Sequence, residues 1–166
     1  MNKAIKALFF CLVGLSSFTV YAEHDAHEMK DYSVEFKEAK PAKDIDVEKC
    51  WVRLMPNTLP SAGYFIVSNN SDADINLLAA RTDQFQITML HESFEEDGLS
   101  KMEMAKHIQI KAGDSLEFKP GGLHAMFEEP IHTLNVGDEL NLELLFTNNK
   151  KKELNCRVHS ASASAY

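Results

Sequence analysis

Short segments in which apolar and polar residues alternate recur along this chain, with turn-forming residues between them. Successive side chains of a β-strand point to opposite faces, so this alternation predicts strands that bury one face. Short strands separated by turns favour an antiparallel β-sandwich or barrel. We therefore predict an all-β fold in which no segment sustains a helical period, although 61–66 or 76–83 could hold a turn of helix. The alternating segments are Tyr32/Val34/Phe36, Cys50/Val52/Leu54, Phe85/Ile87/Met89 and Leu140/Leu142/Leu144/Phe146, and the turn formers include Asn69-Asn70-Ser71-Asp72, Asp97-Gly98, Pro120-Gly121-Gly122 and Gly137-Asp138.

The first 22 residues have the pattern of an export signal. Lys3 and Lys6 make a basic start, an apolar run follows over 7–15, and Val20-Tyr21-Ala22 suits signal peptidase. The run is shorter than the roughly 20 residues of a membrane span, so we expect no stable membrane anchor. A lipoprotein signal at Cys11 is disfavoured because Phe9-Phe10 before it are not small. We predict export, with cleavage after Ala22.

The chain that remains after the predicted signal is acidic. Without Lys3 and Lys6, the 17 basic residues fall to 15 against 25 acidic ones, and the formal charge moves from −8 to −10. Nucleic acid is an improbable partner for such an acidic chain, because phosphate binding requires clustered Lys and Arg. We expect a His- and acid-rich extension at 23–43, one domain at 44–159 and a flexible tail at 160–166.

Two cysteines, Cys50 and Cys156, remain after removal of the signal. In an oxidising compartment an even pair most simply forms a disulfide, here between the first part of the domain and its last strand. A redox-active or metal-binding pair is the alternative, although a Cys-x-x-Cys spacing is absent.

The residues with metal-binding chemistry gather between 89 and 126. His91 ends one predicted strand, Met102 lies in the next, and His124-Ala-Met126 follows a glycine-rich turn. Residues two apart in a strand share a face, and a hairpin would bring His91 near Met102. Two imidazoles with two thioethers suit Cu(I) better than Zn²⁺ or Ca²⁺.

The same residues also have ordinary explanations. A lone Met in a strand more often fills the core, which applies to Met102, Met104 and Met126. We assign Met55 and Met89 to packing and expect no metal role for His107 or His132. From spacing alone, the copper site and the packing roles both stay open.

The arrangement His91, ten residues, Met102, twenty-one residues, then His124-x-Met126 resembles the motif of the periplasmic copper chaperones called PCu(A)C. Trp51-Val52-Arg53, Ala62-Gly63-Tyr64 and Lys119-Pro-Gly-Gly-x-His124 agree with it, so the resemblance covers about 45–158. It implies a periplasmic protein with a cupredoxin-like antiparallel β-sandwich that binds Cu(I) at an exposed site. Carried over by position, the copper ligands are His91, Met102, His124 and Met126. Glu92 departs from the family, where many members have Met directly after the His.

The resemblance also implies a function. Members deliver copper toward the binuclear centre of cytochrome c oxidase, often alongside a Sco-type thiol protein. We therefore expect a copper-acceptor protein of one of these kinds as partner. Ligand exchange would transfer the ion, because an acceptor's thiolates can displace weak thioethers one at a time.

The predicted mature N-terminus carries a second candidate site. Glu23-His24-Asp25-Ala26-His27-Glu28-Met29 holds His24, His27 and Met29 among acidic residues, and such a tract could capture Cu(II). A solvated acidic tail is the alternative.

Other functions have partial signals in the sequence. Cys156-Arg-Val-His159 has the Cys-x-x-His spacing of a blue-copper site, but Ser164 stands where a Met would follow. A copper oxidase with an N-terminal His would need His24 one position earlier. A metal-free interaction module on a β-sandwich and a periplasmic storage or resistance protein both remain alternatives. No nucleophile–base–acid set is evident, so we predict a binding protein and not an enzyme.

Overall fold

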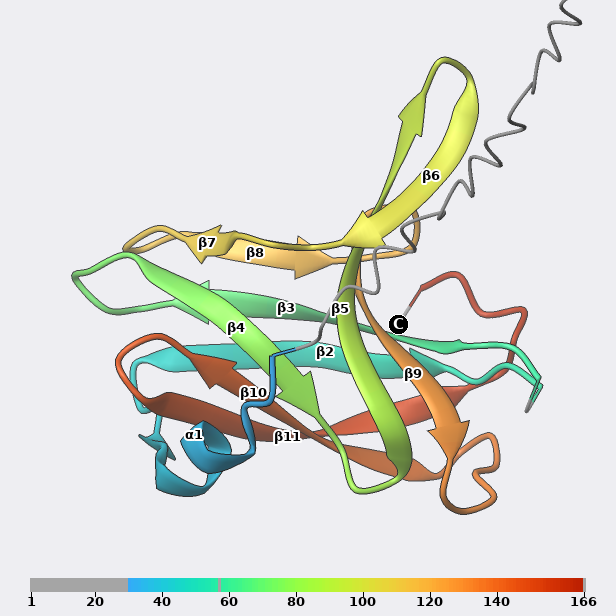
Figure 1. Ribbon diagram of the computed structural model, residues 1–166, viewed down its shortest axis with the longest axis horizontal. Coiled ribbons are helices and arrows are strands. Elements are labelled where there is room, and N and C mark those ends of the chain that lie inside the picture. The colour runs from blue at the N-terminus through green and yellow to red at the C-terminus, as the bar shows by residue number, and fades with distance from the viewer. Residues whose placement is uncertain (1–29, 57, 166) are drawn as a thin grey trace, which may run out of the picture. The chain divides into compact units, whose positions relative to one another are not determined.

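The computed structural model describes residues 30–56 and 58–165 (Figure 1). The predicted export signal at 1–22 and the tract with His24, His27 and Met29 lie outside the described residues. The elements within them are α1 (Ser33–Glu38), β1 (Lys40–Pro41), β2 (Ile45–Arg53), β3 (Ser61–Asn69), β4 (Ile75–Arg81), β5 (Phe85–Glu96), β6 (Leu99–Met104), β7 (Ile108–Ile110), β8 (Ser115–Phe118), β9 (Leu123–Pro130), β10 (Glu139–Phe146) and β11 (Lys150–His159).

The strands form one continuous, mostly antiparallel sheet that encloses its own core. The order along the sheet is β6-β5-β9-β3-β2-β11-β10-β4-β7, with β1 added beside β11 and β8 beside β3. The pairings of β11 with β2 and β1 are parallel, whereas the other pairings are antiparallel. One buried apolar cluster takes side chains from every strand except β1 and β6. The predicted all-β fold is confirmed.

Two sequence predictions about local structure were wrong. The alternation at Tyr32/Val34/Phe36 suggested a strand, but Tyr32 is the N-cap of α1 and the other two residues lie within this helix. Tyr32 and Phe36 lie one helical turn apart and both belong to a small cluster with Leu145, whereas Val34 is exposed. The Asp31 carboxylate accepts a hydrogen bond from the Ser33 backbone N–H at 2.8 Å. This bond satisfies one of the backbone N–H groups that have no partner within the first turn of a helix.

The short helical turns allowed at 61–66 and 76–83 are also absent, because 61–66 belong to β3 and 76–81 belong to β4, which ends just before 82–83. In β3 nearly every side chain is buried, on both faces of the sheet. A strand buried on both faces has a continuous apolar run instead of an alternation, and such a run is ambiguous between strand and helix.

A disulfide joins Cys50 of β2 to Cys156 of β11, across 106 residues of sequence. Both cysteines are buried in the main apolar cluster. The bond therefore ties two neighbouring strands in the middle of the sheet. Within the described residues, no helix combines the length and the apolar character needed to cross a lipid bilayer.

Candidate functional site

Three adjacent strands, β9, β5 and β6, carry the predicted ligands on one face of the sheet. Residue His91 of β5 pairs directly with His124 of β9, and Ser93 pairs with Met102 of β6. Met126 lies two residues after His124 in β9. Paired residues of an antiparallel sheet share a face, and so do residues two apart in one strand. The fold therefore places His91, Met102, His124 and Met126 on the same face.

The opposite face of β5 and β9 supplies the apolar core. Leu90, Ala125 and Phe127 alternate with the predicted ligands and all three belong to the main buried cluster. The two imidazoles thus stand on rigid strands whose backs are anchored in the core. His91 and His124 are nevertheless each only 7% exposed, and Met126 is 8% exposed.

The two imidazole rings lie nearly parallel, with centroids 6.0 Å apart and an interplanar angle of 26°. His124 Nδ1 is 2.9 Å from the backbone carbonyl oxygen of Gly122. A carbonyl oxygen can only accept, so Nδ1 is the donor in this contact, and in the neutral tautomer Nε2 then carries the lone pair. A metal-binding His is commonly fixed in this way, with one ring nitrogen donating to a carbonyl and the other free for the metal.

His91 has an unusual environment. Its Nδ1 is buried and has no hydrogen-bond partner among the described residues. Burial, and then the nearby His124, lower the pKa of His91 below its ordinary value of 6.5, which keeps the ring neutral. A buried ring nitrogen without a hydrogen-bond partner is an unsatisfied polar group, and metal binding is one role that such a nitrogen can serve.

The methionines differ in their placement. Met102 is 53% exposed, whereas Met104 is half-buried and stands directly opposite His91. Met89, which we assigned to packing, pairs with Met126 and shares the face of the predicted ligands. Sequence reasoning thus gave Met104 and Met89 only packing roles.

The other candidates do not join this group. His107 and His132 are exposed. Cys156 is bonded to Cys50 and its sulfur is not a free thiolate, which excludes the blue-copper arrangement with His159. Among the residues that the structure describes, no three His, Cys, Asp or Glu side chains are grouped as a metal site.

A row of aromatic rings continues this face away from His124. The Tyr64 ring lies 6.4 Å from the His124 ring, and Trp51 lies 4.6 Å from Tyr64. The Arg53 guanidinium donates a hydrogen bond of 2.6 Å to the Tyr64 hydroxyl oxygen. These contacts fix the flank of the site nearest to β3.

The chain matches a known protein family over most of its length. The family model described as "Putative lipoprotein LpqE-like" matches residues 45–158. The chain belongs to the LpqE-like family. A protein of Rickettsia prowazekii named "Uncharacterized protein RP573" is 29% identical over 99 residues, and "Putative lipoprotein Lxx21020" of Leifsonia xyli subsp. xyli is 28% identical over 109 residues. The matches cover 59% and 65% of this chain, and only 55% and 65% of these two relatives.

Solved structures of PCuAC domains share the fold of this LpqE-like domain. The apo PCuAC domain of PmoF2 superposes with a TM-score of 0.61 at 18% identity, covering 74% of this chain and 95% of that domain. The Cu(I) form of DR1885 from Deinococcus radiodurans superposes with a TM-score of 0.55 at 25% identity, covering 74% of this chain and 80% of that protein. The predicted cupredoxin-like β-sandwich and the predicted relationship to PCuAC proteins are therefore confirmed.

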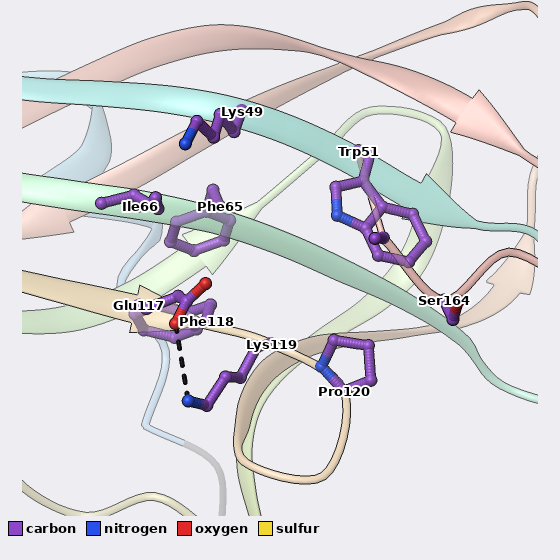
Figure 2. Close-up of a pocket in the computed structure, with 10 residues that line it drawn as sticks. Lys49, Trp51, Phe65, Ile66, Glu117, Phe118, Lys119, Pro120 and Ser164 are labelled. Carbon is purple, nitrogen blue, oxygen red and sulfur yellow. Dashed lines mark ion pairs between the residues drawn. The ribbon is translucent and has the colours of Figure 1, made fainter.

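The LpqE-like domain also has a surface hollow of about 310 Å³, which Figure 2 shows between β2, β3 and β8. Trp51 and Pro120 line it, together with Lys49 and the ion pair between Lys119 and Glu117. Its lining contains no His, Met or Cys. The hollow is thus separate from the predicted ligands, although the loop through Pro120 leads directly to His124.

Proposed function

We propose that this protein is a periplasmic copper chaperone that binds Cu(I) through His91, Met102, His124 and Met126. One observation carries the proposal: two buried imidazoles lie side by side on a face that also bears thioethers, and His91 Nδ1 has no hydrogen-bond partner among the described residues. Neutral imidazole and thioether donors match the preference of Cu(I) for soft and borderline ligands. The similarity to structures described as the copper-bound PCuAC domain of PmoF2 and as Cu(I)-DR1885 supports the choice of metal.

Delivery occurs by ligand exchange at the exposed side of this site. The exposed thioether of Met102 is the ligand that an incoming acceptor can reach first, whereas the imidazoles are almost covered. Each thioether bond is weaker than a bond to thiolate, so a thiol acceptor replaces the methionines stepwise. A cytochrome c oxidase subunit or a Sco-type thiol protein is the proposed acceptor, and the protein acts as a binder without catalysis.

We also propose that the protein is exported and that its signal is removed. Membership of a family described as lipoproteins is consistent with an exported protein. We propose cleavage after Ala22 and a copper-binding domain at 44–159, with His24, His27 and Met29 as a secondary Cu(II) site in the preceding extension. Mass spectrometry of the secreted chain tests this: a mature chain that starts at Glu23 supports it, whereas a lipid-modified Cys11 contradicts it.

Copper binding is tested by X-ray absorption on the Cu(I)-loaded chain together with competition against a chromophoric Cu(I) chelator. We expect nitrogen and sulfur neighbours of copper. His91→Ala and His124→Ala should each weaken affinity by more than the roughly 10–100-fold that loss of an outer-shell partner costs. The exposed His132→Ala variant is the matched control and should keep full affinity. A chain that leaves all Cu(I) with the chelator would instead be the metal-free interaction module.

A further inference from the structure

The partner of His91 on β6 is Met104. The register of the β5–β6 hairpin places His91 opposite Met104 and Ser93 opposite Met102. The Ala105 backbone N–H donates to the Leu90 carbonyl oxygen, so Leu90 and Ala105 form a hydrogen-bonded pair. His91 and Met104 are then a non-hydrogen-bonded pair, the kind in which the Cα atoms are closer, at about 4.5 Å. Met102 stands diagonally to His91, where the separation is about 7–8 Å.

The methionine closer to His91 is also the less exposed of the two. Met104 is half-buried beside His91, and Met102, further along the protruding hairpin, is 53% exposed (Figure 1). Neither side chain belongs to the apolar core. Methionine side chains are unbranched and have three rotatable bonds, so they adapt readily to a nearby ligand. Both thioethers can therefore reorient toward an ion held by the imidazoles.

We propose that Met104 is a further copper ligand, an inner thioether that shares one coordination position with the outer thioether of Met102. The proposal rests on the proposed function, because it concerns the same Cu(I) ion between His91, His124 and Met126. In the stored state the Met104 sulfur occupies the fourth position. In the transfer state the bond from copper to Met104 breaks as a bond to Met102 forms, and copper stays Cu(I) throughout with no electron or proton moved.

This arrangement separates retention from release. The inner position is half-buried and close to His91, so it favours tight holding. The outer position brings the ion to the exposed edge of the hairpin, where an acceptor can attack it. Copper then reaches the acceptor without the imidazoles having to leave first.

The test compares Met102→Leu, Met104→Leu and the double variant in the full chain. Leucine keeps the apolar volume and removes the sulfur donor. We expect each single variant to retain the wild-type number of sulfur neighbours in X-ray absorption, because the remaining methionine takes the position. The double variant should lose one sulfur neighbour and at least about tenfold in Cu(I) affinity. Glu103→Gln is the matched control, since Glu103 lies between the two methionines on the other face of β6 and should change neither quantity.

Transfer kinetics distinguish the two roles. Met102→Leu should slow copper transfer to a dithiol chelator and keep affinity, whereas Met104→Leu should weaken affinity and speed transfer. The proposal is overturned if Met102→Leu alone removes one sulfur neighbour while Met104→Leu changes neither sulfur count nor affinity, because Met102 would then be the sole ligand from β6. A wild-type chain with no Cu(I) in its site would instead contradict the proposed function itself.

Discussion

Strands β10 and β6 belong to the same sheet but differ sharply in how far their side chains are buried. In β10, Leu140, Leu142 and Leu144 are completely buried, and the neighbouring strand β11 is tied to β2 through Cys156. In β6, no residue is buried, and Leu99 is 66% exposed. Strands β5 and β9 lie between these extremes, with core residues on one face and the proposed ligands on the other. Core packing and the proposed metal ligands thus lie mainly in different regions, and we expect most substitutions in one region to leave the other unchanged.

The largest effect on folding is expected in β10. Leu142→Ala should lower the free energy of unfolding by about 2–5 kcal/mol, because it removes buried methyl groups and leaves a cavity. Urea denaturation measures this change. Leu99→Ala on the hairpin is the contrasting variant, and a change in stability there as large as that of Leu142→Ala would contradict the division between the two regions.

Removal of the disulfide should have a similar or slightly smaller effect. The bond closes a loop of 106 residues, for which the chain-entropy model gives up to about 4.7 kcal/mol of stabilisation. A Cys50→Ser plus Cys156→Ser variant should therefore unfold at lower urea concentration. It should also keep the wild-type number of sulfur neighbours around Cu(I), since neither cysteine belongs to the site. Loss of a sulfur neighbour in this variant would connect the two regions that we separate.

A pH effect on stability is expected from His91, on the face of β5 away from the core. The folded protein lowers the pKa of His91 because burial disfavours the charged ring. Above about pH 6.5 the ring is neutral in both folded and unfolded states, so it does not lower the free energy of unfolding. As pH falls through the folded-state pKa, the unfolded chain binds the extra proton first, so the free energy of unfolding decreases. Urea denaturation between about pH 8 and pH 5 should show this decrease, and His91→Gln should reduce it.

The smallest effect is expected at the hairpin surface. Leu99→Ala removes an exposed side chain that contributes nothing to the core, so stability should change by no more than about 0.5 kcal/mol. Thermal denaturation of the apo chain measures it. Cu(I) affinity should also stay unchanged, because Leu99 pairs with Glu96 at the far end of the hairpin from His91.

The sequence predicted the fold class and brought the right strands together, but not every pairing. Alternation at Leu140 to Phe146 matched a strand because one face of β10 is buried. The same pattern at Tyr32 to Phe36 failed, since an interval of four residues also fits one helical turn. The proximity of His91 to Met102 was predicted, whereas the direct pairing of His91 with Met104 was missed.

A signal for that pairing was nevertheless present. Asp97 and Gly98 both have positive φ, at 53° and 74°, which suits a two-residue hairpin turn. Such a turn pairs Glu96 with Leu99, and counting outward along both strands then reaches His91 and Met104. Within the described part of the chain His91 Nδ1 has no hydrogen-bond partner, and this depends on contacts between distant strands that no local pattern encodes.

The aromatic row beside the site gives the protein a built-in optical reporter. Trp51 is the single tryptophan of the chain, and its ring contacts Tyr64, which in turn contacts His124. The emission of this one indole should therefore respond to an ion placed between His91 and His124. Copper uptake and release could then be followed in real time, without any attached dye.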